Sequence, residues 1–281
     1  MNHPRAAMAE DALLEDVCSV VRSVARDEVM PRYRRVGHHR KPDGTLCTEA
    51  DLGAQAVLVG RVRALRPLPV IGEEMNAEEQ RSAWERGAGS VWCVDPVDGT
   101  SNFVHGVPWF AVSVALLAQG RPRLGVVYAP ATDEMFTARR GRGSQLNGEL
   151  LRPGPVAPEL RSAMANVDFR RIPPSLAQAL AARAPYCSHR SLGAATLEWC
   201  YLAAGRLDVY VHGGQKLWDY AAGSLVLEEA GGIVGSFERE DFWGGSEWRR
   251  SVVAAHHPDL YPVWRQWVDE HLGAAATQVA A

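Results

Sequence analysis

The stretch Trp92-Cys93-Val94-Asp95-Pro96-Val97-Asp98-Gly99-Thr100-Ser101-Asn102-Phe103 ends an apolar run with two carboxylates three residues apart, followed by a glycine and a hydroxyl. Residues 90–94 are typical of a buried strand, and Pro96 predicts the end of that strand because proline cannot donate to a sheet ladder. Asp95 and Asp98 would then converge across a tight loop. Because two carboxylates held that close repel each other, the segment indicates a cation between them.

The ligand atoms of this segment favour a hard cation. Mg²⁺ or Mn²⁺ takes oxygen ligands and keeps water and phosphate in its shell, so the pair suits these ions better than zinc. Gly99 lets the backbone approach an anion closely, and a helix beginning near Thr100 would direct free N–H groups and its dipole at a phosphate. The alternative interpretation is an ordinary Asp-Pro-x-Asp-Gly turn.

Acidic side chains recur at two other element boundaries. Residues 69–74 form a short apolar run that ends in Gly72, Glu73 and Glu74, which predicts carboxylates at the C-terminal end of a strand. Asp219 opens a helix that continues through Leu227 and stops at two glycines. Its alternative interpretation is a helix N-cap.

A fourth element is the turn-rich segment 41–51, which leads into an amphipathic helix with Leu58, Val62 and Leu65 on one face. Thr48 and Asp51 there could form merely a capping box. Each element alone has such a structural explanation, but four of them in one chain favour a functional site.

The order of these motifs resembles the inositol monophosphatase family of magnesium-dependent, lithium-sensitive phosphatases. The likeness runs from about Lys41 to about Val268, and its motifs are more specific for the wider superfamily than for a substrate. It rests on Thr48-x-x-Asp51, Gly72-Glu73-Glu74, Asp95-Pro96-Val97-Asp98-Gly99-Thr100-x-Asn102-Phe103 and Trp218-Asp219-x-Ala221-Ala222-Gly223. The resemblance implies an α+β fold, a layered α/β/α/β/α sandwich of the sugar-phosphatase type with the site between two lobes, and a homodimer.

The resemblance also implies roles for residues, carried over through the motifs. The first Mg²⁺ would be held by Glu73, Asp95 and the Val97 carbonyl and would polarise the attacking water. Thr100 and Asp51 would complete the activation as a general base.

Asp95, Asp98 and Asp219 would hold a second Mg²⁺ against the ester oxygen, and the Gly99 and Thr100 N–H groups would cradle the phosphate. Glu74 is either a ligand of a third, weaker ion or a solvated acid at a strand end. Mn²⁺ is a possible substitute for Mg²⁺ at these positions.

On the substrate side, Gly193, Ala194, Ala195 and His212 match positions that line the pocket in inositol-selective relatives. Those relatives carry an acid where this chain has His212. A carboxylate accepts two hydroxyl hydrogen bonds, whereas imidazole offers one donor and one acceptor, so a different specificity is indicated. The alternative for His212 is a surface histidine at a strand end.

Composition is consistent with a soluble enzyme in the cytoplasm. The chain has 281 residues, is 47% hydrophobic and has a net charge of −3, which gives no reason to expect nucleic acid or a membrane as partner. No apolar stretch could span a bilayer, and the first eleven residues lack the apolar core of a signal peptide.

The five cysteines are scattered, which favours reduced and mostly buried thiols. Lysine occurs only at 41 and 216, beside the motifs above.

Hydrophobic periodicity alone predicts a mixed α and β protein, which a Pro- and Gly-containing segment divides into two lobes. Residues 1–150 would form an α+β lobe that carries most metal ligands, with a long N-terminal helix and an antiparallel meander over 111–117, 124–128 and 134–138. A linker near 152–158 would precede an α/β lobe over 151–281 that carries Asp219 and the substrate-side pocket. That lobe would have helices over 175–182, 194–204 and 260–271, a strand over 207–211, strands near 233 and 252, and a frayed tail from 273.

The sequence therefore predicts a phosphomonoester hydrolase in which metal-activated water attacks a small phosphorylated polyol or similar metabolite. Alternatives within the superfamily are a 3′-phosphoadenosine 5′-phosphate, sugar-bisphosphate or histidinol-phosphate phosphatase. An alternative of another class is a non-catalytic regulatory or binding protein on the same scaffold. The ligand set opposes this last alternative, because none of Asp51, Glu73, Asp95, Asp98, Thr100 and Asp219 is missing.

Overall fold

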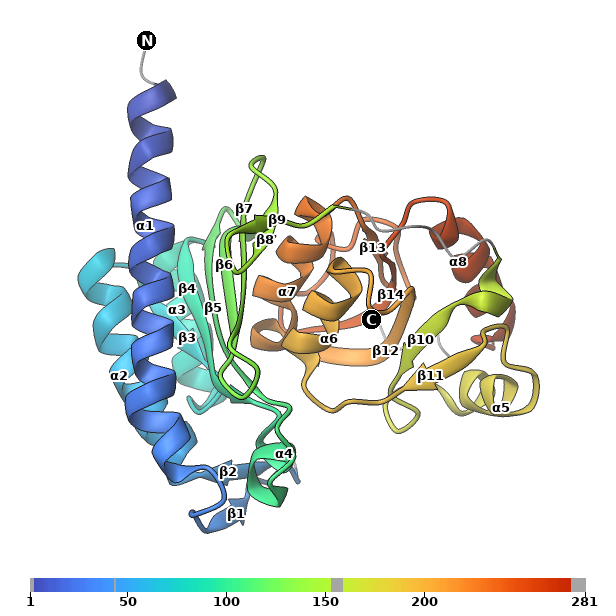
Figure 1. The fold of residues 1–281 in the computed structure, drawn as a ribbon, viewed down its shortest axis with the longest axis horizontal. Helices are drawn as coiled ribbons and strands as arrows, with labels where there is room; N and C mark the ends of the chain where they lie inside the picture. Colours follow the sequence, from blue (N-terminus) through green and yellow to red (C-terminus); the bar gives the residue numbers. More distant parts are fainter. Residues whose placement is uncertain (1–2, 43, 153–158, 274–281) are drawn as a thin grey trace.

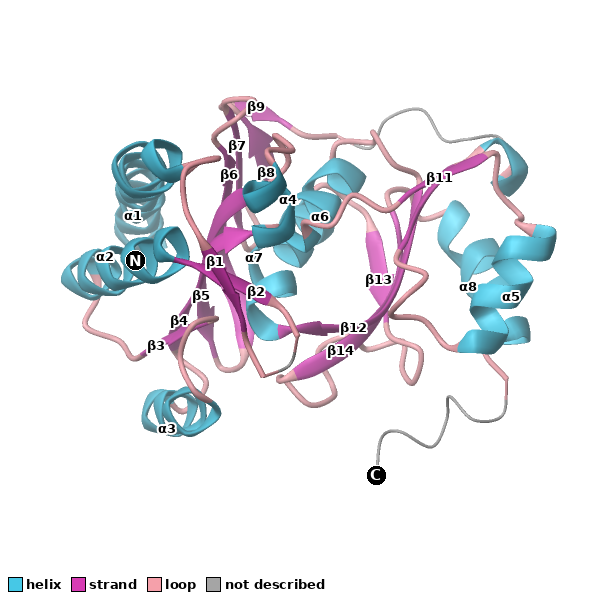
Figure 2. Cartoon of the chain, turned by 90° about the horizontal axis from the view of Figure 1, so that it is seen from below, coloured by secondary structure: helices cyan, strands magenta, loops and turns pink. Residues whose placement is uncertain are grey.

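The computed structural model describes residues 3–42, 44–152 and 159–273. Within these ranges the chain is built of five layers, which alternate between helices and sheets (Figures 1 and 2). The α+β class and the predicted layer order are confirmed. No helix in the described ranges is both long and apolar enough to cross a membrane.

The first layer consists of α1 (His3–Val24) and α2 (Glu49–Leu65), which lie side by side on one face of the larger sheet (Figure 2). Val17, Val21 and Val24 of α1 are fully buried and share a core with Leu58 and Val62 of α2. Their spacing of three or four residues places them on one face of each helix. A π turn (Ala25–Val29), a 3-10 turn (Met30–Arg32) and the hairpin β1 (His38–Arg40) and β2 (Leu46–Thr48) join the two helices.

The larger sheet has seven strands whose spatial order is their chain order. The strands are β3 (Val70–Gly72), β4 (Val91–Asp98), β5 (Ala111–Ala118), β6 (Arg121–Ala129), β7 (Glu134–Arg139), β8 (Ser144–Leu146) and β9 (Glu149–Leu150). β3 and β4 are parallel and are joined by α3 (Ala77–Gly87), whereas the later strands are antiparallel, which confirms the predicted meander.

Both faces of this sheet are buried, which explains its unbroken apolar runs. Val112 and Val114 of β5 pack into the core with α1 and α2, whereas Ala115 and Leu117 pack into the core on the opposite face. Successive side chains of a strand point to opposite faces, so a doubly covered strand is apolar at every position.

The middle layer consists of α6 (Ala195–Ala203) and α7 (Leu217–Glu229), which lie between the two sheets (Figure 1). Their buried residues share one core with side chains of both sheets. The two helices are so close that a Cβ atom at Gly223 would lie 2.5 Å from the Trp199 Cβ atom. A helix that is covered on all sides is apolar on all its faces, and most of the buried residues of α6 and α7 are apolar.

The smaller sheet has five strands in the order β11-β10-β12-β14-β13, namely β11 (Ser188–Arg190), β10 (Met164–Val167), β12 (Val209–Lys216), β14 (Arg249–Ala255) and β13 (Ile233–Gly235). α5 (Pro174–Arg183) and α8 (Leu260–His271) cover its outer face and close the third core. β12 extends past the predicted end at Val211 because the pairing with β14 shifts between His212 and Gln215. Most of the predicted linker and tail lie outside the described residues.

One expectation was wrong at Pro96. β4 does not stop there but continues to Asp98, with Asp95 opposite Ser113 and Asp98 opposite Ala111 on β5. The three-residue interval from Asp95 to Asp98 on β4 therefore pairs with the two-residue interval from Ser113 to Ala111 on β5, which defines a β-bulge. Proline is tolerated at such bulges.

Candidate metal and catalytic site

The bulge in β4 decides where the two aspartates point. Residues three apart in a regular strand face opposite sides of a sheet. Ser113 and Ala111 are two apart and face the same side, so their partners Asp95 and Asp98 also face one side, toward the middle layer. The two carboxylates are therefore brought to the same side of the sheet by an extra residue in a continuous strand, and not by the predicted loop.

Asp51 connects a helix start to a hydroxyl on another element. Its Oδ2 atom accepts from the Thr48 N–H at 2.8 Å and from the Thr48 hydroxyl at 2.5 Å, which forms the predicted capping box of α2. Its Oδ1 atom accepts from the Thr100 hydroxyl at 3.1 Å. The capping box and the predicted catalytic contact thus coexist on one fully buried carboxylate.

Thr100 is the first residue of α4 (Thr100–His105), as predicted. Its hydroxyl lies 3.1 Å from both Asp51 Oδ1 and the Val97 carbonyl oxygen. A hydroxyl has one proton, so it can donate to only one of these acceptors at a time. Gly99 before it has φ +89, a left-handed conformation that a residue with a side chain rarely adopts.

Lys41 lies between the two glutamates that follow β3. Its Nζ atom is 2.8 Å from Glu73 Oε1 and 2.7 Å from Glu74 Oε1. The Glu74 side chain is only 4% exposed, so Glu74 is not the solvated acid of the alternative interpretation. Burial alone would lower the pKa of Lys41, but the two carboxylates outweigh it and raise that pKa.

Asp219 is the third residue of α7 and not its N-cap. Its Oδ2 atom accepts from the backbone N–H of Lys216 at 2.8 Å. Burial raises the pKa of Asp219 to about 7, with a further contribution from the charge of Asp98.

The pKa values of several carboxyl groups in this region are raised by burial and by the neighbouring negative charges. Burial, together with the charges of Glu73, Asp98 and Asp219, raises the pKa of Asp95 well above its ordinary value. Burial also raises the pKa of Glu73 to about 8 and that of Asp98 to about 6. The structure therefore gathers acidic groups that disfavour one another's ionised forms.

These groups fit a hard cation by chemistry, since carboxylate and carbonyl oxygens are the ligands that Mg²⁺ prefers. Within residues 3–42, 44–152 and 159–273, no three Asp, Glu, His or Cys side chains converge closely enough to hold an ion. Instead, internal donors reach the carboxylates: Lys41 reaches Glu73, and the Val97 N–H reaches Asp95 at 3.1 Å.

Asp98 binds the segment that was predicted to line the substrate pocket. Its Oδ1 atom accepts from the Ala195 N–H at 3.1 Å, and its Oδ2 atom accepts from the Thr196 N–H at 2.7 Å and hydroxyl at 2.6 Å. A Cβ atom at Gly99 would lie 3.0 Å from Ala194 Cβ and 3.4 Å from the Gly193 carbonyl oxygen. The structure thus places Gly193, Ala194 and Ala195 directly against Asp98 and Gly99.

Glu198 holds the other end of this segment and was missed by sequence reasoning. Its Oε1 atom accepts from the N–H groups of Leu192 at 3.2 Å and Gly193 at 2.9 Å, and its Oε2 atom accepts from the Tyr210 hydroxyl at 2.8 Å. Burial raises the pKa of Glu198 to about 7. A glutamate within an otherwise apolar buried helix is the sequence signal that could have identified it.

His212 is 8% exposed, so it is not the surface histidine of the alternative interpretation. Its Nδ1 atom accepts from the Gly214 N–H at 3.0 Å, and its Nε2 atom lies 3.8 Å from Asp168 Oδ2. Burial lowers the pKa of His212 to about 4, and the charge of Asp168 only partly opposes this. His212 is therefore a neutral side chain near neutral pH.

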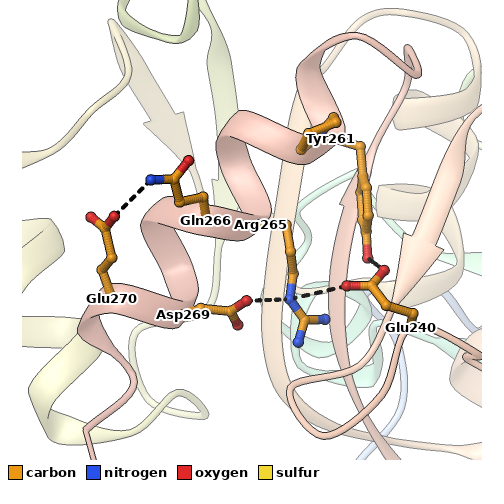
Figure 3. Close-up of a pocket in the computed structure, with 7 residues that line it drawn as sticks. Glu240, Tyr261, Arg265, Gln266, Asp269 and Glu270 are labelled. Carbon is orange, nitrogen blue, oxygen red and sulfur yellow. Dashed lines mark hydrogen bonds and ion pairs between the residues drawn. The ribbon is translucent and has the colours of Figure 1, made fainter.

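A surface pocket lies elsewhere, along the outer helix α8 (Figure 3). The side chains there bind one another: Arg265 pairs with Asp269 at 2.8 Å, and the Tyr261 hydroxyl donates to Glu240 at 2.9 Å. None of the predicted site residues lines this pocket. The buried carboxylates at the ends of β3 and β4 remain the better candidate, because their chemistry is specific.

Comparisons with known proteins identify the family of the chain. The family model described as the inositol monophosphatase family matches residues 4–275. Nus factor SuhB of Vibrio cholerae is 37% identical over 224 residues, which cover 77% of this chain and 80% of that protein.

Two solved structures are similar to nearly the whole chain. The SuhB extragenic suppressor protein of Bartonella henselae has a TM-score of 0.78 and 26% identity, over 92% of this chain and 99% of that one. An IMPase of Thermotoga maritima has a TM-score of 0.76 and 30% identity over the same shares. By its sequence, its fold and the order of its acidic motifs, the chain belongs to the inositol monophosphatase family.

Proposed function

We propose that this protein is a magnesium-dependent phosphomonoester hydrolase that acts on a small phosphorylated metabolite. The observation that carries the proposal is the contact of the Thr100 hydroxyl with Asp51 across 49 residues of sequence, beside a set of buried carboxylates. A buried carboxylate that accepts from a hydroxyl is arranged to take up a proton. The family membership supports a phosphatase-type enzyme.

In this proposal Glu73, Asp95 and the Val97 carbonyl would hold one Mg²⁺, and Asp95, Asp98 and Asp219 would hold a second. When bound, Mg²⁺ supplies Lewis-acid polarisation and neutralises charge on the phosphate. A third ion beside Glu74, Mn²⁺ as a substitute, inhibition by lithium, a homodimer and a cytoplasmic location are further parts of the proposal that rest on the resemblance.

The chain's own groups have separate tasks. Thr100 orients the attacking water, and Asp51 accepts the proton through the Thr100 hydroxyl. The N–H groups of Gly99 and Thr100 bind the phosphate. Gly193, Ala194, Ala195 and His212 contact the alcohol half of the substrate.

A second candidate function is regulatory. Several similar proteins, among them those of Vibrio cholerae and Escherichia coli, are named Nus factor SuhB and not as phosphatases. The complete set of predicted catalytic side chains favours hydrolysis over this second candidate.

Phosphate release tests the proposal most directly. The purified protein would be assayed in millimolar Mg²⁺ against inositol phosphates, sugar phosphates, histidinol phosphate and 3′-phosphoadenosine 5′-phosphate, with Asp51→Asn as the matched inactive variant. We expect release by the natural protein and at least a hundredfold less by the variant. The same slow release by both proteins, on every substrate, would favour the regulatory candidate.

A further inference from the structure

Three cations gather near His212 and Asp219. Lys216 and Arg249 lie directly opposite each other on β12 and β14, and Arg171 lies in the turn that follows β10. All three residues are exposed. Like charges opposite each other on neighbouring strands destabilise a sheet unless something neutralises them.

These three cations lack acidic partners in the part of the chain that the structure describes. Asp168, three residues before Arg171, is engaged by its own turn, where it accepts from the Arg170 N–H at 3.0 Å and lies 3.5 Å from the Arg170 Nε atom. No carboxylate forms an ion pair with Arg171, Lys216 or Arg249 within the described ranges. None of the three cations is therefore held in an ion pair within the described ranges.

The β-bulge in β12, between His212 and Gln215, positions two of these cations. A Cβ atom at Gly214 would lie 2.3 Å from the Arg249 Nε atom, and one at Gly213 would lie 1.7 Å from the Arg171 carbonyl oxygen. Side chains at these two positions would displace the Arg249 guanidinium and the Arg171 backbone. The two glycines thus bring both arginines against the strand that leads to Asp219.

The cluster lies beside the proposed site. The Lys216 N–H donates to Asp219 Oδ2 at 2.8 Å. The Gly214 N–H, at the position next to the Arg249 guanidinium, donates to His212 Nδ1 at 3.0 Å. The cluster consequently lies on the side of the site where the alcohol half of a substrate would be bound.

We propose that the preferred substrate is a phosphomonoester carrying a second anionic group, and that Arg171, Lys216 and Arg249 bind that group. This inference rests on the proposed function. Guanidinium groups match the geometry of phosphate and carboxylate and bind them through two parallel hydrogen bonds. A neutral polyol offers these cations nothing to neutralise, and the uncharged His212 ring beside them provides no carboxylate for its hydroxyls.

Matched substrate pairs test the proposal. Fructose 1-phosphate with fructose 1,6-bisphosphate, and inositol 1-phosphate with inositol 1,4-bisphosphate, differ within each pair by one phosphate. We expect the natural protein to prefer the bisphosphate in at least one pair, about tenfold in kcat/KM and mainly through KM. That preference should weaken as salt is raised from 0.05 to 0.5 M, since the contacts are partly exposed.

Variants assign the preference to the cluster. Arg249→Gln and Arg171→Gln should each reduce the ratio of the two kcat/KM values about tenfold, whereas Arg183→Gln, an exposed arginine at the end of α5, should leave the ratio unchanged. His212→Glu should also reduce the ratio, because it places a carboxylate beside the arginines.

Failure of the anion subsite and failure of the proposed function would give different results. Hydrolysis of all four substrates with no preference, or a preference that survives both arginine variants, overturns the anion subsite and leaves the phosphatase proposal standing. Hydrolysis of none of them, nor of any other phosphomonoester, overturns the proposed function and the subsite together.

Discussion

Asp98 and Glu198 hold the same segment from its two ends. Asp98 accepts from the N–H groups of Ala195 and Thr196, and Glu198 accepts from those of Leu192 and Gly193. Asp98 belongs to the larger sheet and Glu198 to the middle layer. The position of the substrate-side segment relative to the carboxylates is therefore set by two buried acids on different elements.

Glu198→Gln should loosen that segment. An amide has one acceptor oxygen, so at least one of the three donors that now reach the carboxylate loses its partner. We expect kcat/KM for phosphate release to fall about tenfold, with a loss of about 1 to 3 kcal/mol in the free energy of unfolding. Enzyme kinetics and urea denaturation would measure the two effects, with the exposed Glu149→Gln as control. Kinetics identical to those of the natural protein would show that Glu198 has no role in positioning.

His212 should make stability depend on pH. Burial lowers the pKa of its ring from 6.5 to about 4, so the folded protein holds it neutral where the unfolded chain would protonate it. Its contribution is fully present above about pH 6.5 and is lost as the pH falls through that range toward 4, to a limit on the order of 3 kcal/mol.

Comparison with His212→Gln isolates this effect from the titration of the carboxylates. Urea unfolding at pH 7.5 and pH 5 should show a stability difference between the two proteins that shrinks at the lower pH, by about 2 kcal/mol. A difference that stays constant between the two pH values would contradict the prediction.

Asp95→Asn should abolish turnover and preserve the fold. Burial, together with the charges of Glu73, Asp98 and Asp219, raises the pKa of its carboxyl group, so the neutral amide removes an unfavourable ionisation in the metal-free protein. We expect Tm in EDTA to be equal to or above that of the natural protein, and Mg²⁺ to raise Tm only in the natural protein. Near-normal phosphate release by the folded variant would refute the assignment of Asp95 as a metal ligand.

Activity should depend on hard cations. We expect full activity in millimolar Mg²⁺, loss of activity in EDTA with recovery on adding Mg²⁺ back, and inhibition by lithium, as the family resemblance implies. The oxygen ligands proposed for the site favour Mg²⁺ or Mn²⁺ over zinc. A titration of phosphate release against each ion checks this, and the oxygen-ligand assignment fails if zinc alone supports turnover.

Thr100→Val should lower kcat far more than it affects substrate binding. Valine keeps the shape of threonine but removes the hydroxyl that contacts Asp51. We expect kcat to fall about a hundredfold or more, because the path from the attacking water to the carboxylate is lost. Thr100→Ser retains the hydroxyl and should keep much of the activity. Equal losses in the two variants would show that packing of the threonine methyl, and not proton transfer, is what matters.

The sequence was sufficient for the elements with strong local signals. The helix over 260–271, the meander and the capping box at Thr48 and Asp51 were all predicted, because spacing and end residues determine them locally. The bulge at Pro96 was not predicted, since register depends on which residues of β5 oppose β4 and not on β4 alone.

The residues that sequence analysis missed are those whose contacts involve distant parts of the chain. Lys41 stood out only as one of two lysines, and its contact with Glu73 and Glu74 spans more than thirty residues. Glu198, Arg171 and Arg249 have no local motif, because their partners come from other strands and helices. The short strands β10 and β11 and the helix α3 were also missed, since few residues carry their periodic pattern.

The burial of α6 and α7 on all sides has a consequence for how the molecule can come apart. The two helices shield the inner face of each sheet from water. The sheets in turn bury the apolar side chains of the helices. A fragment that ends near residue 150 would expose one face of the seven-stranded sheet to solvent. The complementary fragment would expose the apolar faces of α6 and α7 that now pack on that sheet. Each half of the polypeptide therefore needs the other to bury its apolar surface, and we expect neither half to fold stably on its own.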